Sequence, residues 1–163
     1  MGQRVIKRKK QKHLKQKAKE LNTTTINVSE LAEALTNLRN AIAMEIKGLQ
    51  VGALDLDKIK DASVDLLKQK FEGSYQLIVE FNNKKLTPLI DRFNKQFGSS
   101  GKSEYDLTDP EVMEYIMLFQ QVADEAMQLN ETISTTTIAP YKALKKEIEA
   151  NKENIIEGEI DGE

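Results

Sequence analysis

The sequence predicts an all-α fold, a bundle of four to five helices with a basic N-terminal arm and an acidic C-terminal tail. The first observation is composition: the 163 residues include only eight Gly and three Pro, 6% are aromatic, and Lys, Glu, Leu, Ala and Gln are common, which favours helix. The second is apolar spacing at helical steps through most of the middle of the chain. The third is length, which suits one domain with appendages.

Charge divides the chain into an arm at 1–24, a helical body at 25–150 and a flexible acidic tail at 151–163. Residues 1–20 hold nine Lys or Arg and one Glu, a net of +8, whereas residues 147–163 hold seven acids and one Lys, a net of −6. The 126 residues between them carry 14 bases and 18 acids, so the three parts sum to the net −2 of the chain. A segregation of this kind is typical of interaction tails.

The arm has a thin apolar stripe at Leu14, Ala18 and Leu21, and Lys and Gln surround it on every side. We expect a fluctuating helix at best, because like charges repel at i,i+4 and the stripe is narrow. The Thr-rich "LNTTTIN" that follows favours extended or turn conformations and would form the hinge to the body.

The first helix of the body is predicted to begin at Asn27, three residues before Glu30, in a variant of the capping box. A heptad-like spacing follows at Leu31, Leu35, Leu38, Ile42 and Leu49. "GLQVGALD" is expected to break this helix, and "EGSY" to end a second helix that starts near Asp55. The second helix would carry Leu56, Ile59, Leu67 and Phe71 on one side.

Residues 75–97 leave two interpretations open. "YQLIVEF" alternates like a strand, while a helical face also fits Tyr75, Ile78, Leu86, Leu89, Phe93 and Phe97. We favour helix, because no second strand-like run lies nearby. Pro88 then either kinks one long helix or begins a new one capped by Thr87. "GSSGKSEYD" has the composition of a loop.

The clearest helix begins with Thr108 or Asp109 as its cap and Pro110 in its first turn. Its apolar positions alternate in steps of three and four, as in a coiled coil, and form a predicted core or oligomer face. This face comprises Val112, Tyr115, Phe119, Val122, Ala126, Leu129 and Ile133. "STTTIAP" is expected to interrupt the chain before a shorter last helix with Tyr141, Leu144 and Ile148.

Several patterns resemble ligand sites but lack a necessary residue. "GSSGKS" ends like a phosphate-binding loop, yet Gln96 stands where the first Gly is required and no helix is predicted to follow. Asp55, Asp57 and Asp61 are not followed by the ligand and the Gly of a calcium loop. The chain has no cysteine, which excludes disulfides and thiolate ligands. We expect no metal and no cofactor.

Catalytic groups are scarce. His13 is the only histidine; it lies among cations that disfavour its protonation and has no predicted partner for general-base work. A pair of carboxylates brought together by the fold, such as Glu80 and Asp91, stays open as an acid–base alternative. The sequence predicts a protein that is not an enzyme.

The nine cations of the arm form the predicted polyanion-binding site. They include no aromatic side chain to stack on bases, so we expect contacts to phosphates without sequence preference, or to an acidic protein surface. A run that only aids solubility is the alternative. The residues are Arg4, Lys7, Arg8, Lys9, Lys10, Lys12, Lys15, Lys17 and Lys19.

The functional expectation is a non-enzymatic structural or assembly protein that forms a homo-oligomer and contacts nucleic acid or an acidic partner through its arm. No apolar run approaches the ~20 residues that span a bilayer, so we expect the cytoplasm, or a virion or other assembly formed there. An internal, portal-proximal or scaffold-like bacteriophage protein suits this organisation by analogy.

Two other functions stay open. "VSELAEAL" resembles the first helix of a helix-turn-helix, which would make the protein a DNA-binding regulator. A chaperone-like adaptor would instead bind another protein through its apolar helix faces.

Overall fold

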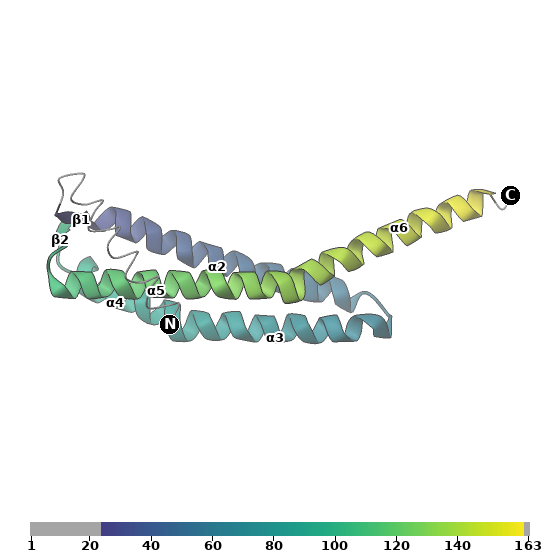
Figure 1. The fold of residues 1–163 in the computed structure, drawn as a ribbon, viewed down its shortest axis with the longest axis horizontal. Coiled ribbons are helices and arrows are strands. Elements are labelled where there is room, and N and C mark those ends of the chain that lie inside the picture. Colours follow the sequence, from purple (N-terminus) through teal and green to yellow (C-terminus); the bar gives the residue numbers. More distant parts are fainter. Residues whose placement is uncertain (1–23, 162–163) are drawn as a thin grey trace. The chain divides into compact units, whose positions relative to one another are not determined.

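The computed structural model describes residues 24–161, with side chains from 24 to 151, and this part of the chain is mostly helical (Figure 1). All nine cations predicted to bind polyanions lie outside the described residues, as do the acidic side chains of the predicted tail. Three long helical segments make up the described part, where the sequence predicts four to five helices.

The first helical segment is α2 (Val28–Asp57). The second contains the 3₁₀ turn η1 (Ala62–Val64), α3 (Asp65–Phe81), the π-helical turn η2 (Asn82–Leu86), α4 (Thr87–Phe93) and the π-helical turn η3 (Asn94–Gly98). The third contains α5 (Pro110–Ile133), the π-helical turn η4 (Ser134–Ile138) and α6 (Ala139–Asp161). Helix α6 thus continues past residue 150, where the sequence predicts the tail to begin.

A two-stranded antiparallel sheet precedes α2 and α5. Strand β1 (Thr25–Asn27) pairs with β2 (Glu104–Asp106), with Ile26 opposite Tyr105. The sequence predicts no sheet. "TTTIN" is expected to be extended, but its partner lies almost 80 residues away in "SEYD", and neither segment alone has the length or alternation that indicates a strand.

Two predicted helix breaks are wrong. Helix α2 continues through "GLQVGALD" because Leu49 and Leu56, on either side of Gly52, are both buried, and packing outweighs the low helix propensity of glycine. Helix α3 likewise continues through "EGSY", so the segment 75–81 is helix and the strand alternative is excluded. Helix α2 ends only at Asp57.

Two of the three prolines follow a π-helical turn. The N–H of Thr87 donates to the carbonyl of Asn82, five residues back, and Pro88 comes next. Ala139 donates to Ser134 in the same way ahead of the proline at 140. Proline lacks an N–H, and its ring clashes with the carbonyl four residues earlier. The wider turn therefore lets each helical segment continue past its proline, where the sequence predicts a kink or a break.

Two helix starts are confirmed with their caps. Asn27 Oδ1 accepts from the N–H of Ser29 at 2.8 Å and of Glu30 at 3.4 Å, and α2 begins at the next residue after Asn27. Asp109, not Thr108, caps α5: its Oδ1 accepts from the N–H of Glu111 at 2.9 Å. Each cap satisfies backbone donors that have no partner inside the helix.

The described chain divides into two compact units, where the sequence predicts a single body. Unit 1 comprises residues 24–44 and 79–127, and unit 2 comprises residues 45–78 and 128–161. The core of unit 1 is aromatic: the ring centroid of Phe97 lies 5.1 Å from that of Tyr115, 4.8 Å from Tyr105 and 5.6 Å from Phe93. The buried Tyr115 hydroxyl donates to the carbonyl of Leu89 at 3.1 Å, and burial raises the pKa of Tyr115.

The core of unit 2 is built around one aromatic contact and one polar contact. Phe71 meets Tyr141 edge-on, with centroids 5.2 Å apart. The hydroxyls of Ser74 and Thr137 form a buried hydrogen bond of 2.7 Å. Gly52 lies against the ring of Phe71, at a position where any Cβ would collide with that ring. Glycine is therefore required there by close approach between α2 and α3.

Candidate functional site

The predicted core or oligomer face on α5 is mostly inside the protein. Val112, Tyr115, Val122, Ala126 and Ile133 are buried, and Phe119 and Leu129 are half-buried. Self-association through this face would require the buried side chains to leave their present contacts. A surface that joins two copies is therefore more readily formed elsewhere on the chain.

Unit 2 has an apolar groove between α2 and α3, which we call the α2–α3 groove. Its volume is about 590 Å³. The buried Leu49 and Phe71 form part of its lining, and Leu54, at its edge, is 65% exposed. The full lining is Leu49, Gln50, Ala53, Leu54, Asp57, Lys68, Phe71, Glu72 and Tyr75. The groove thus lies over two buried core side chains, and the half-buried Ala53 and the exposed Leu54 are apolar lining that solvent reaches.

Polar contacts cross from α2 to α3 at both ends of the groove. Gln50 Nε2 donates to the Tyr75 hydroxyl at 3.4 Å, and Lys68 Nζ lies 3.9 Å from Asp57 Oδ1. Both contacts are long and partly exposed, so each contributes little stability. These two contacts mark the ends of the apolar stretch between α2 and α3.

The groove is the site that the sequence did not reveal. "GLQVGALD" contains four apolar residues besides its glycines, and they fall on more than one side of a helix. If the segment is interpreted as a helix break, its apolar residues cannot be assigned to any face of a helix. As a helix, the segment lies within a buried stripe that runs from Leu49 to Leu56, the next residue after it, and it has a second apolar edge at Ala53 and Leu54. That second edge was the available signal.

A polar cluster in the same unit joins α2 to α6. Asp55 accepts hydrogen bonds from the Tyr141 hydroxyl and from Lys145 Nζ, the latter at 3.1 Å. The Tyr141 contact, followed by that of Lys145, lowers the pKa of Asp55. Burial and the bond to Asp55 raise the pKa of Tyr141. All three groups are satisfied by one another, so the cluster is a helix-to-helix contact with no group poised for proton transfer.

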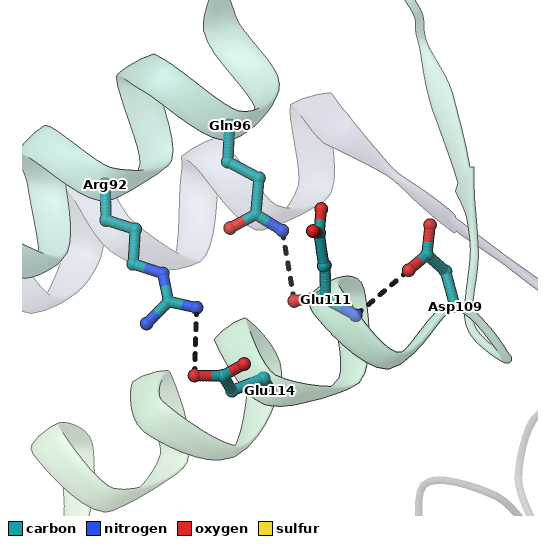
Figure 2. A network of polar contacts seen from close by, with 5 residues as sticks. All are labelled: Arg92, Gln96, Asp109, Glu111 and Glu114. Atoms are coloured by element: carbon teal, nitrogen blue, oxygen red, sulfur yellow. Dashed lines mark hydrogen bonds and ion pairs between the residues drawn. The ribbon is translucent and has the colours of Figure 1, made fainter.

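A second polar network holds the beginning of α5 in unit 1 (Figure 2). Gln96 Nε2 donates to the carbonyl of Glu111 at 3.0 Å, and Arg92 Nη2 lies 3.3 Å from Glu114 Oε1. Arg92 and Gln96 also line a shallow hollow with Pro88, Asp91 and Lys95. The network ties the second helical segment to the third, and its exposed charges are of the kind that contributes little free energy.

Neither the "GSSGKS" loop nor the carboxylate pair Glu80 and Asp91 has the geometry of a ligand or catalytic site. The "GSSGKS" loop is followed by β2 rather than a helix, and Gly101 adopts a left-handed φ of 73°. Glu80 binds Lys84 at 2.6 Å, while Asp91 lies eleven residues further along the same helical segment, roughly 16 Å along the axis. These two carboxylates are too far apart to share a proton.

Asp55, Asp57 and Asp61, whose spacing resembles part of a calcium-binding loop, each make different contacts. Asp55 binds Tyr141 and Lys145, Asp57 faces Lys68, and Asp61 Oδ1 accepts from the N–H of Ser63 at 3.0 Å to start η1. Within the described residues, no group of three or more His, Asp or Glu is placed to hold a metal ion.

The helix-turn-helix interpretation requires a first helix of about two turns that ends at a tight turn. Helix α2 contains "VSELAEAL" and runs on without interruption to Asp57. The turn that would position a recognition helix is therefore missing from this part of the chain. Among residues 24–161, no helix combines the length and apolar character needed to cross a bilayer.

Comparison with known proteins gives no match to a family model, to a curated protein or to a solved structure. A functional assignment therefore rests on the residues of this chain.

Proposed function

We propose that this protein is a non-enzymatic assembly protein that self-associates and binds nucleic acid through its N-terminal arm. The observation that carries the proposal is the separation of charge: residues 1–20 have a net charge of +8, and residues 21–163 have a net charge of −10. Clustered cations on a chain that is otherwise acidic attract phosphates by releasing condensed counterions. The acidic remainder disfavours contact of the body with the same phosphates.

The α2–α3 groove supports the self-association part of the proposal. Its apolar lining includes Leu54, which is 65% exposed, and exposed apolar side chains gathered at a groove are a feature of protein–protein contacts. The α5 face is mostly buried, so the groove replaces it as the surface that we assign to contact between chains. A cationic arm and a self-association surface are both useful to a protein that packs nucleic acid inside a larger assembly. An internal or scaffold-like component of a bacteriophage virion is such a protein, and we name it by analogy of organisation only.

The test is DNA binding with matched charge variants. The arm variant replaces Lys7, Lys9, Lys10 and Lys12 by Gln. The control replaces four exposed lysines of unit 2 by Gln, namely Lys47, Lys58, Lys60 and Lys70; two of these lie on helices and two in the connection between α2 and η1. Fluorescence anisotropy with a random-sequence duplex then gives the affinity at several salt concentrations, and light scattering gives the mass of each chain.

The wild type and the control are expected to bind with a log–log salt slope of roughly −5 to −8, the range for six to nine neutralised phosphates. The arm variant should lose most of this binding. Equal losses in both variants, or no binding by the wild type at low salt, would contradict the proposal. Binding to polyglutamate but not to DNA would identify an acidic protein as the partner instead, and sequence-selective binding that survives moderate salt would support a regulator.

A further inference from the structure

The α2–α3 groove has a defined length that an occupant must match. Its two crossing contacts involve Gln50 and Asp57 on α2, which are seven residues apart and therefore roughly 10 Å apart along the helix. The apolar lining between them comes from Ala53 and Leu54 on one side and Phe71 on the other. Two turns of a helix with a narrow apolar stripe would cover this stretch.

The chain itself contains a segment of matching pattern outside the described residues. Leu14 and Leu21 are also seven residues apart, with Ala18 between them. As a helix these three side chains would fall on one side and span roughly 10 Å. The stripe is too thin to bury itself, and its small central Ala permits close approach to another helix.

Charge also favours this pairing. The groove is lined by two acids, Asp57 and Glu72, and by one cation, Lys68. Lys68 already faces Asp57, which leaves Glu72 as an exposed acid on the α3 side. Residues 12–21 of the arm carry four lysines and one glutamate. Their net charge of +3 complements a groove with a net charge of −1.

We propose that residues 12–21 of this chain dock as a short amphipathic helix in the α2–α3 groove, with Leu14, Ala18 and Leu21 toward Ala53, Leu54 and Phe71. This inference rests on the proposed function in one respect, because it names the occupant of the surface assigned there to contact between chains. An arm from a second copy would join two molecules. The docked arm must come from a second copy: Leu21 precedes Val28 by seven residues, at most roughly 25 Å of extended chain, whereas Gln50 lies roughly 33 Å further along α2.

Disulfide trapping tests the docking, because the full-length chain has no cysteine of its own. Ala18→Cys, at the centre of the stripe, is combined with Ala53→Cys, at the centre of the groove. In a matched control it is combined with Val51→Cys, two residues away on the same helix. Val51 is 57% exposed and does not line the groove, whereas Ala53 is half-buried. A disulfide requires Cα atoms within about 7 Å, so its yield reports residence rather than occasional collision.

Docking predicts a high disulfide yield at Ala53 and a low one at Val51. Random collision predicts the reverse, since Val51 is the more exposed. A covalent dimer on a non-reducing gel supports the assignment, whereas an internal crosslink without a dimer would contradict it, because the arm of the same copy is too short to dock in the groove. Circular dichroism confirms that both variants remain folded.

Equal yields at the two positions, or no crosslink at either, would overturn the docking. DNA binding by the wild-type chain in the same buffer is measured separately. If DNA binding persists while the crosslink fails, only the docking is wrong. If the crosslink forms while DNA binding is absent, the docking stands and the nucleic-acid function is wrong.

Discussion

The cores of the two units differ in how many aromatic rings surround the central phenylalanine. In unit 1, Phe97 is surrounded by three other aromatic rings, and one of them, Tyr105, comes from strand β2. In unit 2, Phe71 is equally buried but has one aromatic neighbour and lies against Gly52, beside the open α2–α3 groove. A core closed by side chains on all sides provides stability. The groove beside the second core is the surface that we assign to a partner segment.

The largest expected effect tests the closed core. Phe97→Ala removes the ring at the centre of the aromatic cluster and should lower the free energy of unfolding by about 3–5 kcal/mol, as for other large-to-small core changes. Urea denaturation measures it. Met127→Ala is the control, because Met127 is 62% exposed. Similar losses in the two variants would show that the cluster is not the core of unit 1.

Gly52 tests the close approach in unit 2. Gly52→Ala places a Cβ against the ring of Phe71, with a second ring atom at 2.9 Å, and should destabilise the protein by about 1–3 kcal/mol through overpacking. Gly48→Ala, one helical turn earlier in α2, meets no atom within 4 Å and should stabilise it by about 0.5–1 kcal/mol. Thermal denaturation of both variants distinguishes them, and shifts of the same sign would contradict this packing.

The buried hydroxyl pair offers a smaller effect. Ser74→Ala or Thr137→Val alone leaves one buried hydroxyl without its main partner, at a cost of about 1–2 kcal/mol. Thr137 retains a weaker contact to the carbonyl of Lys70 at 3.4 Å, which keeps the effect in this range. The double variant removes both groups and should cost less than the sum. Additive losses in a double-mutant cycle would show that the two hydroxyls act independently.

The smallest effect concerns Asp55 and acid. Hydrogen bonds from Tyr141 and Lys145 hold the pKa of Asp55 below its ordinary value of 3.8. The ionised carboxylate therefore adds stability that is fully present above that value and is lost as the pH falls through the lower folded pKa. As the pH falls below about 4, the urea midpoint of the wild type should therefore decrease slightly more than the urea midpoint of Asp55→Asn. Parallel pH profiles for the two proteins would contradict this linkage.

The sequence predicts most of the helices but not where they end. The caps at Asn27 and Asp109 are local, since each side chain bonds to a backbone N–H two residues on. Asn27 is predicted correctly, and Asp109 is one of the two predicted candidates. The continuity of α2 through Gly52 depends on Phe71, which is distant in sequence, so composition alone indicates a break. Pro88 and Pro140 mislead for a related reason, because a π-helical turn before each of them lets the helical segment continue.

The candidate site was largely beyond sequence reasoning. The α2–α3 groove exists only because α2 does not break, and its lining combines residues 49–57 with residues 68–75. The sheet is a similar case: β1 and β2 have three residues each, too few to show alternation. Long-range pairing decides both features, and a single sequence gives local signals only.

The short sheet also has a mechanical consequence for the arm. Strand β1 begins at Thr25, directly after the predicted arm at 1–24. Hydrogen bonds from the N–H of Leu107 to the carbonyl of Thr24 at 2.7 Å and from the N–H of Val28 to the carbonyl of Ser103 at 2.9 Å extend its pairing at both ends. Antiparallel hydrogen bonds run perpendicular to the strands, so a pull along the axis of β1 loads them together in shear rather than one at a time. Tension from a bound polymer would thus be shared with the chain at 103–107 instead of being carried by the first turn of α2 alone.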